Sequence, residues 1–194
     1  MLFPAFAGLA GVDATKVEFN TVDPSARNTI FAAGQLPIIT AFILNLADVE
    51  KLAYSSNPNR KIGALRYADY GLDMYGNGYI TSDPFIAEKP QAVAAFVAAA
   101  AKGLRDTYQD VPAAVDLVRK YNPEVDRDVG IRQLELIQDL VLSPDMRASG
   151  IGSFQEARLQ KTKDVMQQYF PMNRDVPLAE LYTAQFVPNP PVKP

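Results

Sequence analysis

Hydrophobic positions in the first third of the chain follow two different periods. Helical spacing alternates with short apolar or period-two runs, and together they predict the following elements: helix 3–11, strand 17–22, helix 23–33, strand 36–41, helix 45–53 and strand 64–68. Helices that alternate with strands are typical of a parallel sheet with crossover helices. The pattern therefore predicts an α/β lobe, and since no strand precedes the first helix, we expect its sheet to lack a first strand.

Helical spacing dominates after residue 82. Apolar residues recur every three or four positions in four runs, which predict helices at 90–108, 111–121, 126–142 and 153–169. Ser153 with Glu156 three positions later predicts a capping box at the last of these helices. The closing residues, VPNPPVKP, are too rich in proline for regular structure and predict an extended tail.

The first twelve residues, MLFPAFAGLAGV, are apolar but do not resemble a signal peptide. No Lys or Arg precedes the apolar run, and no small-residue cleavage site follows it. Pro4 near the start and Gly11 near the end instead predict a short buried helix, in which Phe3, Phe6 and Leu9 make apolar contacts.

Composition narrows the classes of function. The net charge is −3, and no long block of Lys or Arg is present, so nucleic acid is not an expected partner. The chain contains no His and no Cys, which excludes thiol chemistry, the usual zinc sites and His-based catalysis. We therefore expect a protein that is not an enzyme and holds no cofactor and no metal.

The segment YGNGYITSD at residues 75–83 raises the main question about a site. Its alternation is typical of a strand, but two glycines weaken a strand and mark either a bend or a close backbone approach. Aromatic and polar residues gather in and before it: Tyr67, Asp69, Tyr70, Asp73, Tyr75, Asn77 and Tyr79. They could form a binding wall that stacks on a ring and orients it, or be ordinary strand and turn residues.

A second group of candidates follows the predicted buried strand 36–41. Ligands of parallel sheets bind beyond the carboxyl ends of strands, where Thr40 and Phe42 lie. Phe42 could instead belong to the core, and Asn45 could cap the next helix rather than contact a ligand.

Other patterns are weaker as sites. Asp69 and Asp73 are two carboxylates without a nucleophile or metal cluster beside them. The charged residues of 119–135 have the spacing of a solvated helix face, and Gly150-Ile151-Gly152 lacks the preceding strand of a nucleotide-binding loop.

Three stretches of the chain stand out by their order and spacing: the Ala-Gly-Gln within DPSARNTIFAAGQLPIITAFILN, then YADYGLDMYGNGYITSD, and then AEKPQAVAAFVAAAAKG. Together they resemble a family of bacterial solute-binding proteins that serve ABC importers for sulfonates, taurine, nitrate and thiamine-pyrimidine precursors. The resemblance runs from Leu2 to about Phe186 and rests on the order and spacing of these stretches.

This resemblance implies a class II periplasmic-binding-protein fold, of which the chain would hold the C-terminal two-thirds. Residues 1–69 correspond to most of the second α/β lobe, 70–83 to the return crossover, hinge and a strand, 84–187 to the helical part of the first lobe and the C-terminal helices, and 188–194 to an extended tail. YGNGYITSD then lies at the hinge end of the crossover, with Tyr79 and Ile80 packed further into the strand.

The resemblance also implies a site and partners. Family ligand contacts correspond to Thr40, Phe42, Asn45, Asp73, Tyr75 and Asn77. A small solute would bind between two lobes, and the loaded protein would dock on an ABC permease in the inner membrane from the periplasm. The alternatives are a pyrimidine-biosynthesis enzyme on the same scaffold, which could use a pyridoxal cofactor, and a truncated fragment that binds nothing. A sheet lacking a strand could also recruit one from a second copy in a swapped homodimer.

Overall fold

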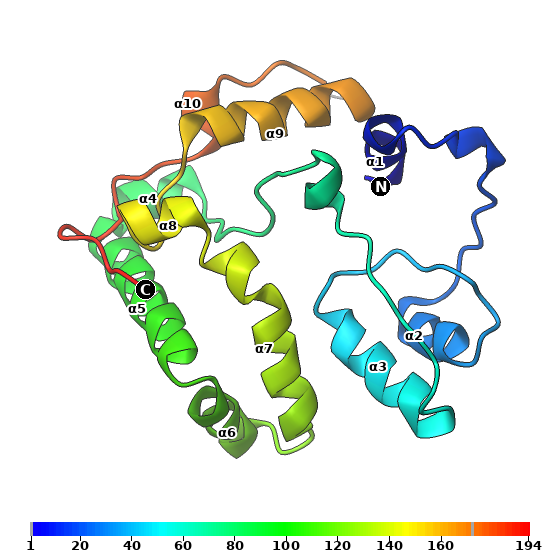
Figure 1. The fold of residues 1–194 in the computed structure, drawn as a ribbon. Coiled ribbons are helices and arrows are strands. Elements are labelled where there is room, and N and C mark those ends of the chain that lie inside the picture. The colour runs from blue at the N-terminus through cyan, green and yellow to red at the C-terminus, as the bar shows by residue number, and fades with distance from the viewer. Residues whose placement is uncertain (1, 172) are drawn as a thin grey trace. The chain divides into compact units, whose positions relative to one another are not determined.

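The computed structural model describes residues 2–171 and 173–194, which form helices joined by irregular chain (Figure 1). The elements are α1 (Phe3–Ala10), η1 (Ala14–Lys16), α2 (Pro24–Ala32), α3 (Asn45–Ser56), η2 (Tyr67–Tyr70), α4 (Asp83–Glu88), α5 (Pro90–Gln109), α6 (Val111–Tyr121), α7 (Arg127–Val141), α8 (Pro144–Ser149), α9 (Glu156–Tyr169) and α10 (Leu178–Leu181), where η marks a 3₁₀ turn.

The predicted parallel sheet is wrong, because the described residues contain no β-strand. The segments 17–22, 36–41 and 76–82 are irregular, and 64–68 is irregular chain that runs into η2. Ile38 and Leu65, which a covered strand would bury, are exposed. The physical reason is that a strand is stable only when a neighbour completes its hydrogen-bond ladder and covers a face, and neither condition is met here.

The chain divides into two compact units, and each is described by itself. Unit 1 comprises Met1–Ala14, Tyr67–Gln109 and Leu142–Pro194, and unit 2 comprises Thr15–Arg66 and Asp110–Val141. The division at residues 69, 83 and 187 that the resemblance implies stays a prediction.

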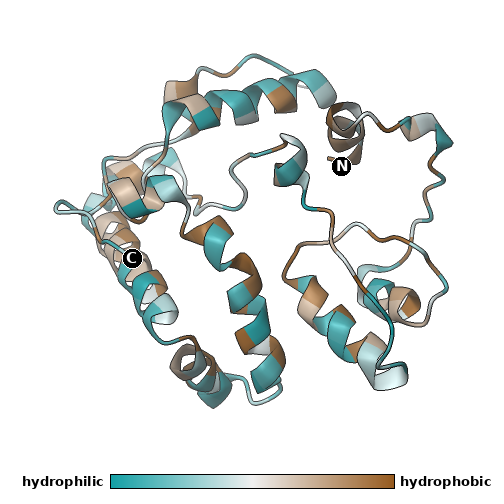
Figure 2. Cartoon of the chain, in the orientation of Figure 1, coloured by the Kyte–Doolittle hydropathy of each residue, from teal (hydrophilic) through white to brown (hydrophobic). Residues whose placement is uncertain are grey.

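The core of unit 1 forms where α1 meets η2. Phe6 is buried, stacks on Tyr67 with ring centroids 4.4 Å apart, and meets the edge of Tyr70 at 5.1 Å. Burial raises the pKa of the Tyr67 hydroxyl. Helix α1 begins with Pro4 in its first turn and ends at Gly11 in a left-handed conformation (φ 68°), as the sequence predicts. Figure 2 shows α1 as a mainly hydrophobic helix, although Leu9, expected to be covered, is exposed.

The C-terminal tail of unit 1 has no regular structure but is packed. The Ile151 N–H donates to the Val192 carbonyl over 2.8 Å. Gly150, with a φ of 102°, lies so close to the tail that an added Cβ would stand 2.5 Å from the Cβ of Pro191. The glycines at 150 and 152 therefore serve a loop that holds the tail.

Unit 2 contains the helix contacts α2–α3, α3–α7 and α6–α7. Asp23 caps α2 by accepting the Ser25 N–H over 2.8 Å, as predicted. The charged residues predicted on a solvated face are well exposed, and some of them also link helices. Arg127 donates to both carboxylate oxygens of Asp116 (2.8 and 3.1 Å), and Lys51 donates to Asp126.

Candidate functional site

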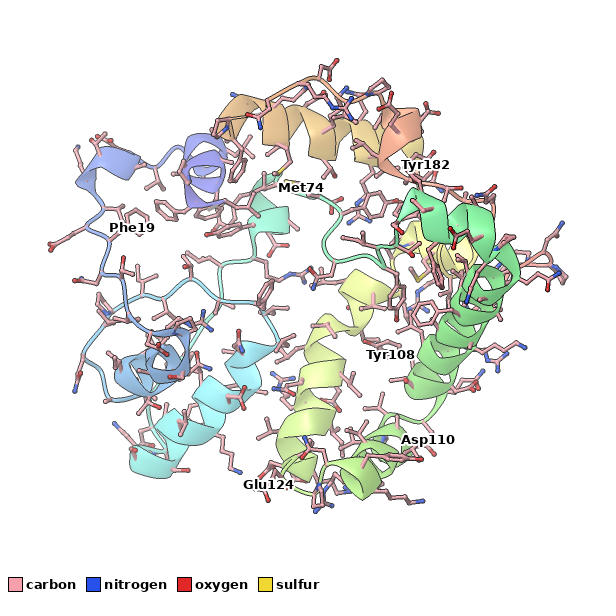
Figure 3. All side chains as sticks on the ribbon, turned by 180° about the vertical axis from the view of Figure 1, so that it is seen from behind. Phe19, Met74, Tyr108, Asp110, Glu124 and Tyr182 are labelled. Carbon is pink, nitrogen blue, oxygen red and sulfur yellow. The ribbon has the colours of Figure 1, made fainter. Side chains whose placement is uncertain are left out.

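The predicted candidates Asp73 and Tyr75 lie in unit 1, on irregular chain between η2 and α4 that runs against α9. Gly71 has a φ of 91° and ends the η2 turn, after which Leu72 enters the core. Met74 packs against the same core next to α9 (Figure 3). Asp73 and Tyr75 flank Met74, so their side chains are held beside the start of α9.

Tyr75 contacts both helix α9 and the two residues that precede it. Its hydroxyl accepts the backbone N–H of Gln155 over 2.8 Å, and its own N–H donates to Thr162 Oγ1 over 3.1 Å. Its ring meets Phe154 edge-on at 5.3 Å. Gln155 is the N-cap of α9 and makes no side-chain cap bond, so the Tyr75 hydroxyl satisfies an N–H at the helix start.

The capping box predicted at Ser153 and Glu156 is wrong. Ser153 Oγ donates back to the Gly150 carbonyl over 2.7 Å, and α9 begins only at Glu156. The hydroxyl is therefore committed to the preceding turn, where such side chains compete with helix caps.

Arg158 is the central charged group of this region. Its guanidinium carbon lies 4.6 Å from the centroid of the Tyr75 ring, and its Nη2 donates to Asp73 Oδ1 over 2.5 Å. The Arg158 side chain is 20% exposed, against 52% for Asp73. Its Nε atom is buried and has no hydrogen-bond partner among the described residues. A buried donor without a partner costs about 1–3 kcal/mol, and more when it belongs to a charged group.

Phe154 extends the region toward α10, since its ring lies 5.1 Å from that of Tyr182, which is labelled in Figure 3. We call the five residues Asp73, Tyr75, Phe154, Arg158 and Tyr182 the Arg158 cluster. It combines one cation, one carboxylate and three aromatic rings. Such a set can orient a small polar or ring-shaped molecule by charge and stacking.

Of this cluster, sequence reasoning proposed Asp73 and Tyr75 as ligand contacts and did not propose Arg158, Phe154 or Tyr182. Arg158 lies 85 positions from Asp73, on a helix whose surface is mainly polar. No local pattern distinguishes it from the other helical arginines of the chain. The only signal available was the aromatic residue four positions before it.

The rest of the YGNGYITSD segment lies open. Asn77 is exposed, Tyr79 is 77% exposed with its ring edge-on to Phe96 at 5.0 Å, and Ile80 is 96% exposed. The expected packing of Tyr79 and Ile80 into a strand is therefore wrong. Gly76 and Gly78 have no atom within 4 Å of an added Cβ, so no close backbone approach explains them among the described residues.

The candidates Thr40, Phe42 and Asn45 lie in unit 2. Thr40 is exposed and Phe42 is 69% exposed, so the alternative that Phe42 belongs to the core is wrong. Asn45 is the first residue of α3, where Leu44 is the N-cap without a side-chain bond. Asn45 Oδ1 instead accepts from Arg27 Nη2 over 3.2 Å, so the capping alternative is also wrong.

Unit 2 also contains a shallow groove of about 290 Å³ between α3 and α7. Its walls carry Ala47, Lys51, Asp126, Asp128, Val129 and Arg132. Lys51 is paired with Asp126, and Arg132 Nε donates to Glu50 over 3.3 Å. Both cations already have carboxylate partners, so the charged side chains that line the groove link α3 to α7.

Two classes of site are absent from the described residues. No three acidic side chains stand close enough together to hold a metal ion, in a chain that contains neither His nor Cys. None of the helices that the structure describes is long and apolar enough to cross a membrane.

Comparison with known proteins identifies the family. Residues 2–114, more than half of the chain, match the family model described as NMT1/THI5 like. The chain belongs to this family of periplasmic solute-binding proteins for sulfonates, nitrate and thiamine precursors, which confirms the resemblance. Most members bind without catalysis, although the family includes a pyrimidine synthase. Neither the curated proteins nor the solved structures contain a match. The matched range includes Asp73 and Tyr75 but ends before Arg158.

Proposed function

We propose that this protein is the substrate-binding component of an ABC importer. It captures a small polar or heteroaromatic solute, such as a sulfonate, nitrate, taurine or a pyrimidine precursor of thiamine, in an interlobe cleft. It then presents the solute to a permease in the inner membrane from the periplasm. Membership of the NMT1/THI5-like family supports the solute-binding role.

One observation in this chain supports the proposal most directly. Asp73 and Tyr75, which correspond to ligand contacts in the family, lie in a cluster of charged and aromatic side chains together with Arg158. We propose that Tyr75, Asn77, Thr40, Phe42 and Asn45 contact the solute, as the resemblance to this family implies. Exposure of Thr40, Phe42 and Asn77 keeps these side chains accessible to a solute.

Thermal-shift measurements on the purified chain test the role. The panel should contain nitrate, taurine, an alkanesulfonate, an aromatic sulfonate and an aminopyrimidine, with sucrose as an unrelated polar control. We expect at least one panel member, and not sucrose, to raise the melting temperature in a saturable way, because a ligand that binds only the folded state stabilises it by mass action. A panel without any saturable shift would contradict the solute-binding role.

The same samples test the alternative of a pyrimidine-synthesis enzyme and the predicted swapped homodimer. Turnover of an aminopyrimidine, or a cofactor absorbance band, would favour the pyrimidine-synthesis alternative. The swapped homodimer stays a prediction, and light scattering after size exclusion tests it, since a monodisperse monomer would contradict it.

A further inference from the structure

Arg158 uses only one of the two N–H groups, Nε and Nη2, with which an arginine side chain can bind a two-oxygen anion. The Nε and Nη2 groups of a guanidinium point to the same side and fit both oxygens of a carboxylate or a similar group. Arg127 shows this full arrangement, since its Nε and Nη2 each bind one oxygen of Asp116. Arg158 places Nη2 on Asp73, whereas its Nε is buried and finds no hydrogen-bond partner in the described part of the chain.

The residues around Arg158 fix the orientation of its guanidinium group. The Tyr75 ring lies under the guanidinium, and the Tyr75 hydroxyl is tied to the backbone of Gln155. Phe154 braces the Tyr75 ring from the edge and contacts Tyr182 in turn. Because the guanidinium is supported on an aromatic face and mostly covered, it is preorganised rather than free to follow a mobile partner.

The two members of the ion pair differ in their access to water. Asp73 is 52% exposed and can turn its carboxylate into solvent at little cost, whereas Arg158 is 20% exposed and stays in place. An anion that replaces Asp73 on Nη2 would lie on the same edge of the guanidinium as Nε and could bind both groups. The exchange leaves Arg158 with two charge-assisted bonds instead of one.

We infer that Arg158 receives the anionic group of the solute, and that Asp73 occupies this position until the solute arrives. The inference rests on the proposed function and narrows its solutes to those with a sulfonate, carboxylate, nitrate or similar group. Tyr75, Phe154 and Tyr182 then contact the remainder of the solute, which favours a flat or apolar body. Asp73 thus opposes binding of an anion, which sets its role apart from that of Tyr75.

Pairs of solutes that share a shape but differ in charge test this role by calorimetric titration. Nicotinate with nicotinamide, and pyridine-3-sulfonate with its sulfonamide, serve as probes. We expect each acid to bind the unmodified protein at least about tenfold more tightly than its amide, a factor in the usual range for a charge-assisted bond. Arg158→Gln should abolish this preference, and Asp73→Asn should tighten binding of the acids about tenfold without changing binding of the amides.

Three controls separate anion recognition from loss of structure. Arg174→Gln removes an exposed cation of the same unit, paired with Glu180 at 3.3 Å, and should keep the preference for acids. Arg158→Lys keeps the charge but not the fork, so its preference should be weaker than that of the unmodified protein. In ¹⁵N spectra, the resonance lost in Arg158→Lys identifies Arg158 Nε–H, and it should shift on addition of acid but not of amide.

The outcomes distinguish the two proposals. Acids and amides that bind equally well, or an Arg158→Gln variant that keeps the preference, would overturn the role of Arg158 while the solute-binding function stands. Weaker acid binding in Asp73→Asn would overturn the exchange with Asp73. Failure of every probe and of the whole thermal-shift panel would overturn both proposals together.

Discussion

Tyr75 stands where a capping side chain is expected at the start of α9. Its hydroxyl accepts the Gln155 N–H, and Ser153, which the sequence favours for capping, is bonded elsewhere. A residue 80 positions away thus provides a bond that local patterns assign to a neighbour. Tyr75 is therefore both a proposed solute contact and a structural residue.

Tyr75→Phe should separate these two roles, because it removes the hydroxyl and keeps the ring over which Arg158 lies. We expect the free energy of unfolding to fall by about 0.5–2 kcal/mol, as for other lost caps. Urea denaturation measures this change. Tyr121→Phe, at a well-exposed position, is the control and should stay within about 0.5 kcal/mol. Equal stabilities of the two variants would show that the Tyr75 hydroxyl does not support α9.

At the scale of elements, the helices were largely predictable and the strands were not. Proline and glycine mark both ends of α1, Asp23 caps α2, and the predicted range 111–121 is that of α6. These signals act within one or two helical turns, so a local sequence pattern contains them. The short apolar runs at 17–22, 36–41 and 64–68 needed neighbouring strands, which depend on distant parts of the chain.

Ion pairs between the helices of unit 2 predict an acid-dependent stability. Hydrogen bonds from Arg127 hold the pKa of Asp116 below its usual 3.8, and those from Lys51 and the backbone N–H of Val129 do the same for Asp126. Since a lowered folded-state pKa stabilises only while the carboxylate is charged, this contribution is complete above 3.8 and is lost as the pH falls through the lowered values.

Circular-dichroism melts recorded from neutral pH downward should therefore show a loss of stability that begins near 3.8 and continues below it. Asp116→Asn, which cannot ionise, should reduce the size of this loss. An unchanged acid profile in Asp116→Asn would show that its pair with Arg127 does not link α6 to α7 in solution.

The packing of the C-terminal tail on the loop after α8 leads to a further prediction. Gly150→Ala would place a Cβ 2.5 Å from Pro191 in a backbone conformation that favours glycine. We expect a loss of about 1–3 kcal/mol in unfolding free energy and faster proteolysis of the tail. Gly63→Ala, where an added Cβ meets no atom within 4 Å, is the matched control. Equal proteolysis of the two variants would contradict the packing of the tail on this loop.

At the scale of the whole molecule, the family was predictable although the sheet was not. The order of the motifs in the first 114 residues is a sequence property, and the family model recognises it. Only two of the five residues of the Arg158 cluster came from the sequence, because Asp73 and Tyr75 lie in the family motif. Arg158, Phe154 and Tyr182 join them only through folding. As ligand contacts, all six candidates stay predictions: Thr40, Phe42, Asn45, Asp73, Tyr75 and Asn77.

The most direct test of the account is the dissociation constant of the best panel solute, measured by calorimetry on the unmodified chain and on Tyr75→Ala. Both proteins should first show the same helical content by circular dichroism. The account predicts saturable binding to the unmodified chain, and at least about tenfold weaker binding to Tyr75→Ala, since that variant loses an aromatic contact and the support of Arg158. Equal dissociation constants would place the solute elsewhere, and the absence of saturable binding would contradict the solute-binding function itself.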